Sequence, residues 1–242
     1  MHWLGFHDPV SAWTHGAWFL LSLPATIWLL SKVRGNLTKQ AGFLIFGIGL
    51  FVCYGGSMLW HTFHIEDLAT LDYIGIFLLI AGTTTAVVVV VLRGVWRWGT
   101  LIYVWLMAVT GVVITLLPMH LPNLVYTGLY LGMGWGMCAS YFELVRVLGQ
   151  RKMFLVILGG VWYSVGAVLN AVHWPVFAPG IFGSHELFHV FVMAGSLTHF
   201  LFMMQVLVPF KRPALVVEAV RKRPVPILQP RLALQHLQGE TA

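Results

Sequence analysis

Residues 184–200, SHELFHVFVMAGSLTHF, place ionisable side chains in one of the most apolar stretches of the chain. His185 and His189 lie four residues apart, and on a helix this spacing puts both imidazoles on one face. Ionisable groups buried among hydrocarbon are costly unless they pair with one another or bind an ion. Because neutral imidazoles are good ligands for divalent metals, the pair predicts a metal site.

Two other apolar stretches supply polar groups that match this pair. Ser57 and His61 share a helix face near the end of YGGSMLWHTFH, and Asp72 lies at the start of TLDYIGIFLLIAGT. If each stretch crosses a membrane, these residues and the histidine pair lie at a similar depth in its outer half. Three imidazoles and one carboxylate match the ligand set of tetrahedral Zn²⁺, which keeps one position for water in catalytic sites.

The histidine pair also fits the pattern H-E-x-x-H, with Glu186 as its acidic residue. In metalloproteases this pattern places two metal ligands on one helix face and uses the glutamate as a general base. Glu186 is therefore a secondary candidate for a base, and an intramembrane metalloprotease is an alternative interpretation. The third ligand of that family is an aspartate downstream of the pair, whereas Asp72 lies upstream.

The other histidines are expected to have ordinary roles. His64, His120 and His173 lie at the ends of apolar stretches, where a histidine is usually interfacial. His15 and His199 lie deeper, and we expect each to form a hydrogen bond with a neighbouring helix.

The composition is that of a protein that crosses a membrane several times. Of 242 residues, 59% are hydrophobic and 9% are charged, whereas a soluble domain carries roughly a quarter charged residues. Runs of about 20 apolar residues span a bilayer as helices. The sequence therefore predicts an all-α membrane protein, a seven-transmembrane helix bundle with a buried zinc site. The predicted spans are residues 12–31, 40–61, 70–92, 98–117, 123–146, 153–172 and 184–209.

Three regions follow from this division. Residues 1–11 are expected to form an interfacial N-terminal segment, residues 12–209 the seven-transmembrane domain, and residues 210–242 a basic, partly disordered cytoplasmic tail. All 14 lysine and arginine residues lie in or beside the first, third and fifth loops or after the last span. Positive residues stay cytoplasmic, so the N-terminus is expected outside and the C-terminus inside.

The net charge of +6 is thus a signal of topology and of attraction to anionic lipid headgroups. Nucleic acid is excluded as a partner, because its binding would need basic residues grouped on a soluble surface.

Small residues predict helix packing: Gly128, Gly132 and Gly136 recur every four residues and indicate a close helix–helix contact. Cys53 and Cys138 are expected to be packing residues.

Two long motifs resemble the haemolysin III / progestin-and-adipoQ-receptor family. They are SMLWHTFH…LDYIGIFLLIAGT and GAVLNAVHWPVFAPGIFGSHELFHVFVMAGSLTHF. The resemblance covers most of the seven predicted spans and implies a seven-helix bundle with a buried zinc ion. It implies that His61, His185 and His189 bind the zinc and that Asp72 and Ser57 hold or activate the attacking water. The receptor members resemble lipid-amide hydrolases, with a metal site similar to that of alkaline ceramidases, and bacterial members carry a haemolysin label.

The sequence departs from the family pattern near these motifs. Trp60 stands where members often have tyrosine, and Tyr73 stands where bacterial members usually have histidine. Thr84 and Ala86 replace a tyrosine and a proline. None of these is a predicted ligand, so we expect changes in the shape of the pocket. The receptor members have the opposite membrane orientation to the one predicted from the basic residues.

The predicted function is that of a zinc-dependent intramembrane hydrolase, which cleaves a lipid amide, as a ceramidase does, or an ester by metal-activated water. Asp72 would accept the proton of that water, and Ser57 would position the water or the carbonyl. The expected partners are membrane lipids in a bacterial inner membrane, and the sequence leaves protein partners open. Alternatives are a receptor or membrane-homeostasis regulator with structural zinc, the metalloprotease, and a pore-forming haemolysin.

Overall fold

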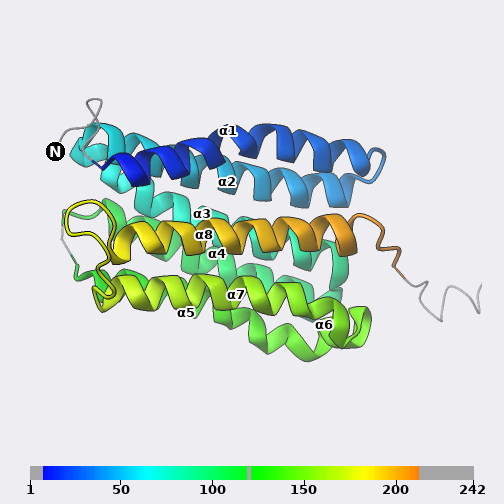
Figure 1. The fold of residues 1–242 in the computed structure, drawn as a ribbon. Coiled ribbons are helices and arrows are strands. Elements are labelled where there is room, and N and C mark those ends of the chain that lie inside the picture. The colour runs from blue at the N-terminus through cyan, green and yellow to red at the C-terminus, as the bar shows by residue number, and fades with distance from the viewer. Residues whose placement is uncertain (1–7, 119–120, 213–242) are drawn as a thin grey trace, which may run out of the picture. The chain divides into compact units, whose positions relative to one another are not determined.

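The structure is a computed structural model that describes residues 8–118 and 121–212. The described residues form helices joined by short connections, apart from one isolated β-bridge between Ala178 and Phe182 (Figure 1). The α-helices are α1 (Pro9–Lys32), α2 (Leu37–Phe63), α3 (Glu66–Val91), α4 (Gly94–Leu116), α5 (Asn123–Trp135), α6 (Tyr141–Leu148), α7 (Gln150–Ala171) and α8 (Ser184–Phe202). A 3₁₀ segment, η1 (Gly136–Ser140), links α5 to α6, and a π-helical segment, η2 (Met203–Leu207), extends α8.

Five helical segments are long and apolar enough to cross a membrane, so the protein is a membrane protein. They are α2, α3, α4, α7 and α8 together with η2. Helix α1 coincides with the first predicted span and the α5–η1–α6 segment with the fifth, but the membrane crossing of these two remains a prediction. Parts of two predicted regions, residues 1–7 and 213–242, lie outside the described residues.

The prediction of one continuous helix over residues 123–146 is wrong, because the backbone tightens to a 3₁₀ helix at Gly136–Ser140. Glycine weakens a helix, and Gly134 and Gly136 both lie at this break. A Cβ atom on Gly136 would overlap the ring of Tyr103, so helices α4 and α5 approach closely there. The hydroxyls of Thr100 and Ser140 also form a hydrogen bond across this contact.

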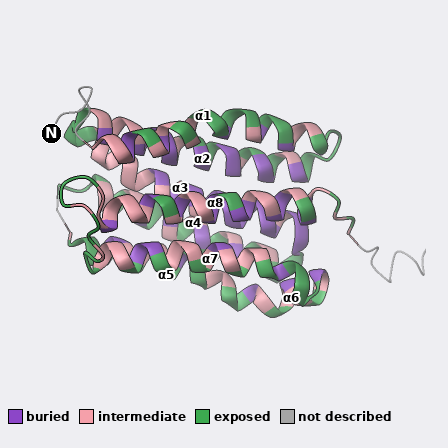
Figure 2. Ribbon diagram, in the orientation of Figure 1, coloured by how far each residue is buried: buried purple, intermediate pink, exposed green. Residues whose placement is uncertain are grey.

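Helix α3 is at the centre of the bundle. In its most apolar stretch, 72% of the residues are buried, against 22% for α4. Figure 2 shows buried residues along α2 and exposed residues on the outer face of α1. In a membrane protein, exposed apolar residues on the outer helices face lipid rather than water.

Helices α2 and α3 contact each other through their backbones along most of their length. The contact is made by glycines spaced seven residues apart, a period that keeps them on one helix face. A Cβ atom would lie 2.8 Å from Leu78 O at Gly49, and at Gly75 it would lie 2.5 Å from Cys53 Cα. We call this set the glycine seam; its members are Gly42, Gly49 and Gly56 of α2 and Gly75 and Gly82 of α3.

The glycines that the sequence analysis singled out for packing do not form such a contact. A Cβ atom added to Gly128 or Gly132 would meet no atom within 4 Å. Of that set, only Gly136 has a position at which an added Cβ atom would meet another helix, although the Tyr103 hydroxyl of α4 donates to the Gly132 carbonyl oxygen at 2.8 Å. The prediction of a close helix contact through Gly128 and Gly132 is therefore wrong, and the glycine seam has that role.

Lys39 lies in the first turn of α2 and is buried. It joins the start of this helix to the residues that follow η2. Its Nζ donates hydrogen bonds of 2.7 Å to the carbonyl oxygens of Val208 and Phe210. These carbonyls follow η2 and would otherwise have no helical partner, so the lysine acts as a side-chain cap.

We predict that Gly75→Val lowers the free energy of unfolding by about 1–3 kcal/mol, because the new side chain overlaps the backbone of Cys53 and pushes α2 and α3 apart. Denaturant titration in detergent micelles, followed by far-UV circular dichroism, measures the change. Gly128→Val is the matched control, since it adds the same side chain to a helix where the space is open. Equal losses in the two variants would show that the seam does not depend on close backbone contact.

Candidate metal centre

Three helix ends meet at one end of the bundle and bring the predicted site residues together. Helix α2 ends there, whereas α3 and α8 begin there (Figure 1). The last contact of the glycine seam, Gly56 against the Leu71 backbone, immediately precedes Ser57 and Asp72 in their helices. His61 follows one turn after Ser57. Backbone packing of α2 on α3 therefore places these side chains next to one another before any ligand binds.

The three predicted ligand imidazoles converge. Nε2 of His61 lies 3.1 Å from Nε2 of His185. The ring centroids are 4.9 Å apart for His61 and His185, 4.9 Å for His61 and His189, and 4.6 Å for His185 and His189. One nitrogen from each ring lies within 4.8 Å of the others. Two nitrogens bound to one tetrahedral Zn²⁺ are separated by about 3.3 Å, so the cluster could hold a metal ion with little movement.

Two further observations fit a bound ion. His61 and His189 are only 2% and 1% exposed, so neither ring obtains its hydrogen bonds from solvent. Nδ1 of His189 and Oγ of Ser57 are buried and have no hydrogen-bond partner. Buried polar atoms without partners are rare in folded proteins. A cation and its water would give these atoms partners and would keep the imidazoles neutral.

The predicted catalytic residues border this cluster. Asp72 is partly buried, and its carboxyl is near enough to Ser57 and His185 to interact with both electrostatically. The Ser57 hydroxyl lies beside this carboxyl and, apart from it, has no hydrogen-bond partner among the described residues. The arrangement therefore offers three nitrogens, one carboxylate and one hydroxyl around a common space, a donor set suited to a divalent metal and its water.

Glu186 has a structural role that the sequence analysis did not predict. Its Oε2 accepts a hydrogen bond of 2.7 Å from the backbone N–H of Gly183, the residue that precedes α8. This contact caps the helix and sets the direction in which α8 enters the site. Its action as a general base remains a prediction.

A second cluster lies directly behind His61 and was also missed. Oδ2 of Asp8 lies 3.0 Å from Nδ1 of His61 and 2.8 Å from Nε2 of His64. The backbone N–H of Asp8 also donates to the His61 carbonyl oxygen, at 3.1 Å. His64 is exposed, as expected for an interfacial residue, but it also binds this carboxylate. The topology contained the relevant signal, because Asp8 precedes the first predicted span and His61 ends the second, which places both at one membrane face.

The two imidazoles decide the ionisation of Asp8. Partial burial would by itself raise the pKa of this carboxyl, but the hydrogen bonds from His61 and His64 outweigh that effect, so its pKa is below the usual 3.8. Asp8 is therefore a carboxylate at neutral pH and can only accept hydrogen bonds.

His15 lies on the other side of the cluster. Its ring stacks on that of His189, with centroids 3.8 Å apart and planes 11° from parallel, and it meets Tyr54 edge-on at 4.9 Å. His15 therefore contacts the neighbouring helix α8 mainly through its aromatic ring, and its hydrogen bond to that helix remains a prediction.

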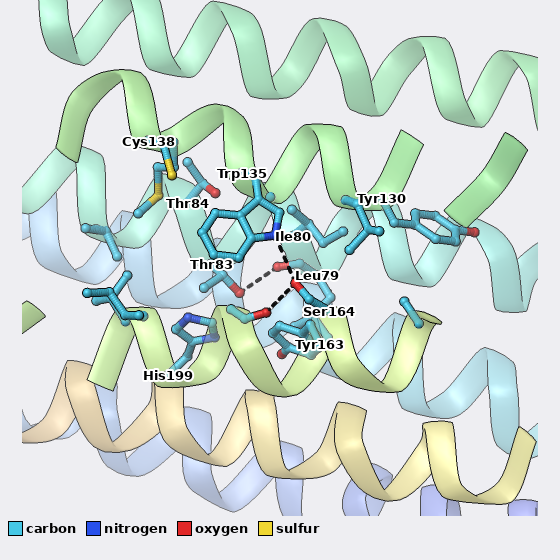
Figure 3. Close-up of a pocket in the computed structure, with 18 of the residues that line it drawn as sticks. Leu79, Ile80, Thr83, Thr84, Tyr130, Trp135, Cys138, Tyr163, Ser164 and His199 are labelled. Carbon is cyan, nitrogen blue, oxygen red and sulfur yellow. Dashed lines mark hydrogen bonds between the residues drawn. The ribbon is translucent and has the colours of Figure 1, made fainter. Parts of the chain in front are cut away.

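An apolar cavity of about 150 Å³ lies between α3, α5, α7 and α8 (Figure 3). It begins one helical turn from the metal centre: Cys53 precedes Ser57 by four residues, and Ile76 follows Asp72 by four. Phe188 and Val192, on α8, each follow one histidine of the pair by three residues and also line this space. We call this space the inter-helix cavity.

The hydroxyl groups on the wall of the inter-helix cavity do not make it polar. Thr83 donates to the Leu79 carbonyl oxygen and Ser164 to that of Gly160, each at 2.7 Å within its own helix. Figure 3 shows these bonds, and the indole of Trp135 bonded to the Ser164 hydroxyl at 2.9 Å. The wall is thus suited to hydrocarbon. His199 also lines the cavity, and its ring lies against Gly159 of α7.

Known proteins match this chain over the region that holds the fold and the site. The model of a family described as haemolysin-III related matches residues 6–200. A protein named hemolysin-3 from Bacillus cereus is 32% identical over 192 residues, which cover 77% of this chain and 85% of that protein. A hemolysin-3 homolog of Bacillus subtilis is 32% identical over 196 residues, covering 78% and 89% of the two chains.

Eukaryotic proteins match more distantly. An ADIPOR-like receptor of Saccharomyces cerevisiae is 38% identical over 80 residues, which cover 31% of this chain and 22% of the receptor. The family match extends from the segment that contains Asp8 to the end of the segment that contains His185 and His189. With its apolar helices and clustered imidazoles, the chain belongs to the haemolysin III family of membrane proteins, to which the ADIPOR-like receptors are more distantly related.

Proposed function

We propose that the protein is a zinc-dependent intramembrane hydrolase that cleaves a lipid amide, as a ceramidase does, or a lipid ester. The observation that carries the proposal is the position of the three imidazoles. They meet beside Asp72 and Ser57, one helical turn from the inter-helix cavity. A metal-binding donor set next to a space for hydrocarbon suits a substrate with one polar bond and a long apolar chain.

The residues divide the chemistry among them. His61, His185 and His189 would hold the ion, and a zinc ion bound there would supply a Lewis acid for the substrate carbonyl and for water. Asp72 accepts the proton of the attacking water as that water adds to the carbonyl carbon. When the bond to nitrogen or oxygen breaks, the same carboxyl returns the proton to the leaving group. Ser57, whose hydroxyl has no other partner, donates a hydrogen bond to the carbonyl or holds the water.

The acyl chain of the substrate lies in the inter-helix cavity. Its mostly apolar wall and its start beside the site support this position, in which the scissile carbonyl would lie at the metal and the hydrocarbon between α3, α5, α7 and α8. Burial of each methylene group in such a space contributes about 0.8 kcal/mol to binding from water. An acyl chain that enters from the bilayer is already surrounded by hydrocarbon, so it does not gain this free energy. The shape and length of the acyl chain therefore become the main basis on which the enzyme selects its substrates.

The membrane orientation is part of the proposal. The basic residues at the end of α1, the start of α2, the end of α3 and the start of α4 lie at the end of the bundle away from the site. By the positive-inside rule this end is cytoplasmic, the N-terminus is outside and the site lies toward the outer leaflet. The Bacillus relatives suit a bacterial cell membrane as the location.

The second candidate function is a receptor or membrane regulator in which the zinc is structural. Similarity to an ADIPOR-like receptor supports it, as does the geometry, because an ion here would join the end of α2 to the start of α8. The name of the Bacillus cereus relative suggests a third, pore-forming activity, which would pass ionic current across a planar bilayer.

We predict about one zinc ion per purified chain and its loss in His61→Ala and in His185→Ala, because two imidazoles hold the ion too weakly to survive purification. Elemental analysis of protein purified in detergent measures the ratio. His173→Asn is the control, since His173 is exposed, lies outside the cluster and has a positive φ that asparagine tolerates. Metal-free wild-type protein would rule out both the hydrolase and the structural-zinc function.

We predict that Asp72→Asn retains zinc but releases fatty acid from ceramide and related fatty-acyl amides or esters about 10²–10⁴-fold more slowly, because it cannot accept the proton of water. Mass spectrometry of the released acid, with zinc content measured on the same sample, tests this. A wild-type protein that holds zinc and hydrolyses none of these lipids would favour the receptor or regulator.

We predict that Gly160→Leu shifts the preference toward shorter acyl chains, by roughly tenfold in the ratio of rates for long and short chains. Gly160 lines the inter-helix cavity and has open space around it, so leucine fills the cavity without displacing a helix. Gly128→Leu is the control, since that glycine also has open space but is not part of the cavity wall. The same chain-length preference in both variants would show that the acyl chain lies elsewhere.

A further inference from the structure

We propose that Asp8 is a positioning residue of the metal centre: its carboxylate holds His61 in the orientation and tautomer that present Nε2 to the ion. This inference rests on the metal site of the proposed function. It assigns a role to a segment that the hydrolase chemistry leaves without one, and it concerns ion affinity rather than the reaction itself.

The hydrogen bonds determine the tautomer of His61. Because the Asp8 carboxylate can only accept, the 3.0 Å contact requires a proton on Nδ1 of His61. A neutral imidazole then carries its lone pair on Nε2, the atom that faces His185 at 3.1 Å. The other tautomer would point an N–H at the position of the ion. Of the three ligand imidazoles, His61 alone forms a hydrogen bond to a carboxylate within the described part of the chain.

Asp8 is itself held in place by two contacts besides the one to the His61 ring. His64 binds the same Oδ2 atom at 2.8 Å, and the Asp8 backbone N–H donates to the His61 carbonyl oxygen. His64 in turn stacks on Trp60, with ring centroids 4.6 Å apart and planes 9° from parallel. The carboxylate is thus fixed relative to the last turn of α2, so that it can orient His61 without adjustment when the ion binds.

The side chain of Asp8 does not cap helix α1, although the residue stands at its N-cap position. Asp8 is the N-cap residue of α1, where an aspartate normally accepts a hydrogen bond from the first turn. Here its side chain makes no such bond. The carboxylate is turned toward the two imidazoles instead, so its replacement tests the metal centre without removing a helix cap.

The same three residues are also close enough to hold an ion of their own. The contacts favour the positioning role, because Nδ1 of His61 and Nε2 of His64 both point at a single oxygen, Oδ2. That oxygen occupies the point where a shared cation would have to sit. Distances of 3.0 Å and 2.8 Å are those of ordinary hydrogen bonds between imidazole and carboxylate.

The test is the zinc dissociation constant of the full-length protein in detergent, measured by competition with a chromophoric chelator after the metal has been removed. We expect Asp8→Ala to bind zinc about 10–100-fold more weakly than wild type, and Asp8→Glu to recover part of the loss. Asp67→Ala is the matched control, because Asp67 is an exposed carboxylate at the same end of the bundle. His64→Ala should weaken binding less than Asp8→Ala, since it removes only the support of the carboxylate.

Each outcome has a distinct meaning. Wild-type affinity in Asp8→Ala, together with lost binding in His61→Ala, would overturn the role of Asp8 and leave the metal centre intact. A wild type that binds no zinc would overturn the proposed function as well. A second equivalent of zinc that disappears in His64→Ala would make the cluster an ion site of its own and refute the positioning role. If Asp8→Ala does not fold, Asp8→Asn, which keeps an acceptor oxygen without the charge, is expected to bind zinc more weakly than Asp8→Glu.

Discussion

The backbone contact between α2 and α3 is the constraint on which the rest of the structure depends. Side chains cannot separate these two helices, because each point of close approach is a glycine. In a membrane there is little hydrophobic drive to join apolar helices, so such contacts rely on dispersion and shape. The seam fixes how α2 and α3 are rotated about their axes, and this rotation places Ser57 beside Asp72. The glycines of the seam thus determine where the polar side chains of the site lie.

The site is built at helix ends because functional side chains can converge there while the helix interiors remain packed. Helix α2 supplies His61 in its last turn, α8 supplies His185 in its first, and Asp8 precedes α1. The contact of Asp8 with His61 gives this imidazole a fixed direction, as carboxylate partners do for histidines in metal sites generally. A centre formed in this way requires no loop to fold around the ion, only helices whose ends lie at one level of the membrane.

Much of this arrangement could be predicted from the sequence, for specific physical reasons. The i, i+4 spacing of His185 and His189 and the direction of each apolar run predicted that these side chains share one depth with His61 and Asp72. Asp8 was missed because the pattern shows depth but not which neighbours touch. The capping role of Glu186 depends on the path of the chain at Gly183, and the break at η1 depends on a contact with another helix. The identity of the metal and of the lipid substrate remains a prediction.

Helix α2 contacts the last helical segment at both of its ends. At one end the Lys39 ammonium holds the carbonyls that follow η2, and at the other the imidazoles of His61 and His185 meet. Two such anchor points, one at each end of α2, leave α2 and α8 little freedom to separate. The α5–η1–α6 segment is held to α4 by the hydrogen bond between Thr100 and Ser140 and to α7 by that of Trp135 on Ser164, and Trp135 and Cys138 also face the inter-helix cavity. If the protein cleaves a lipid as proposed, entry between α5 and α7 would break the Trp135 hydrogen bond, whereas entry between α2 and α8 would break both anchor points.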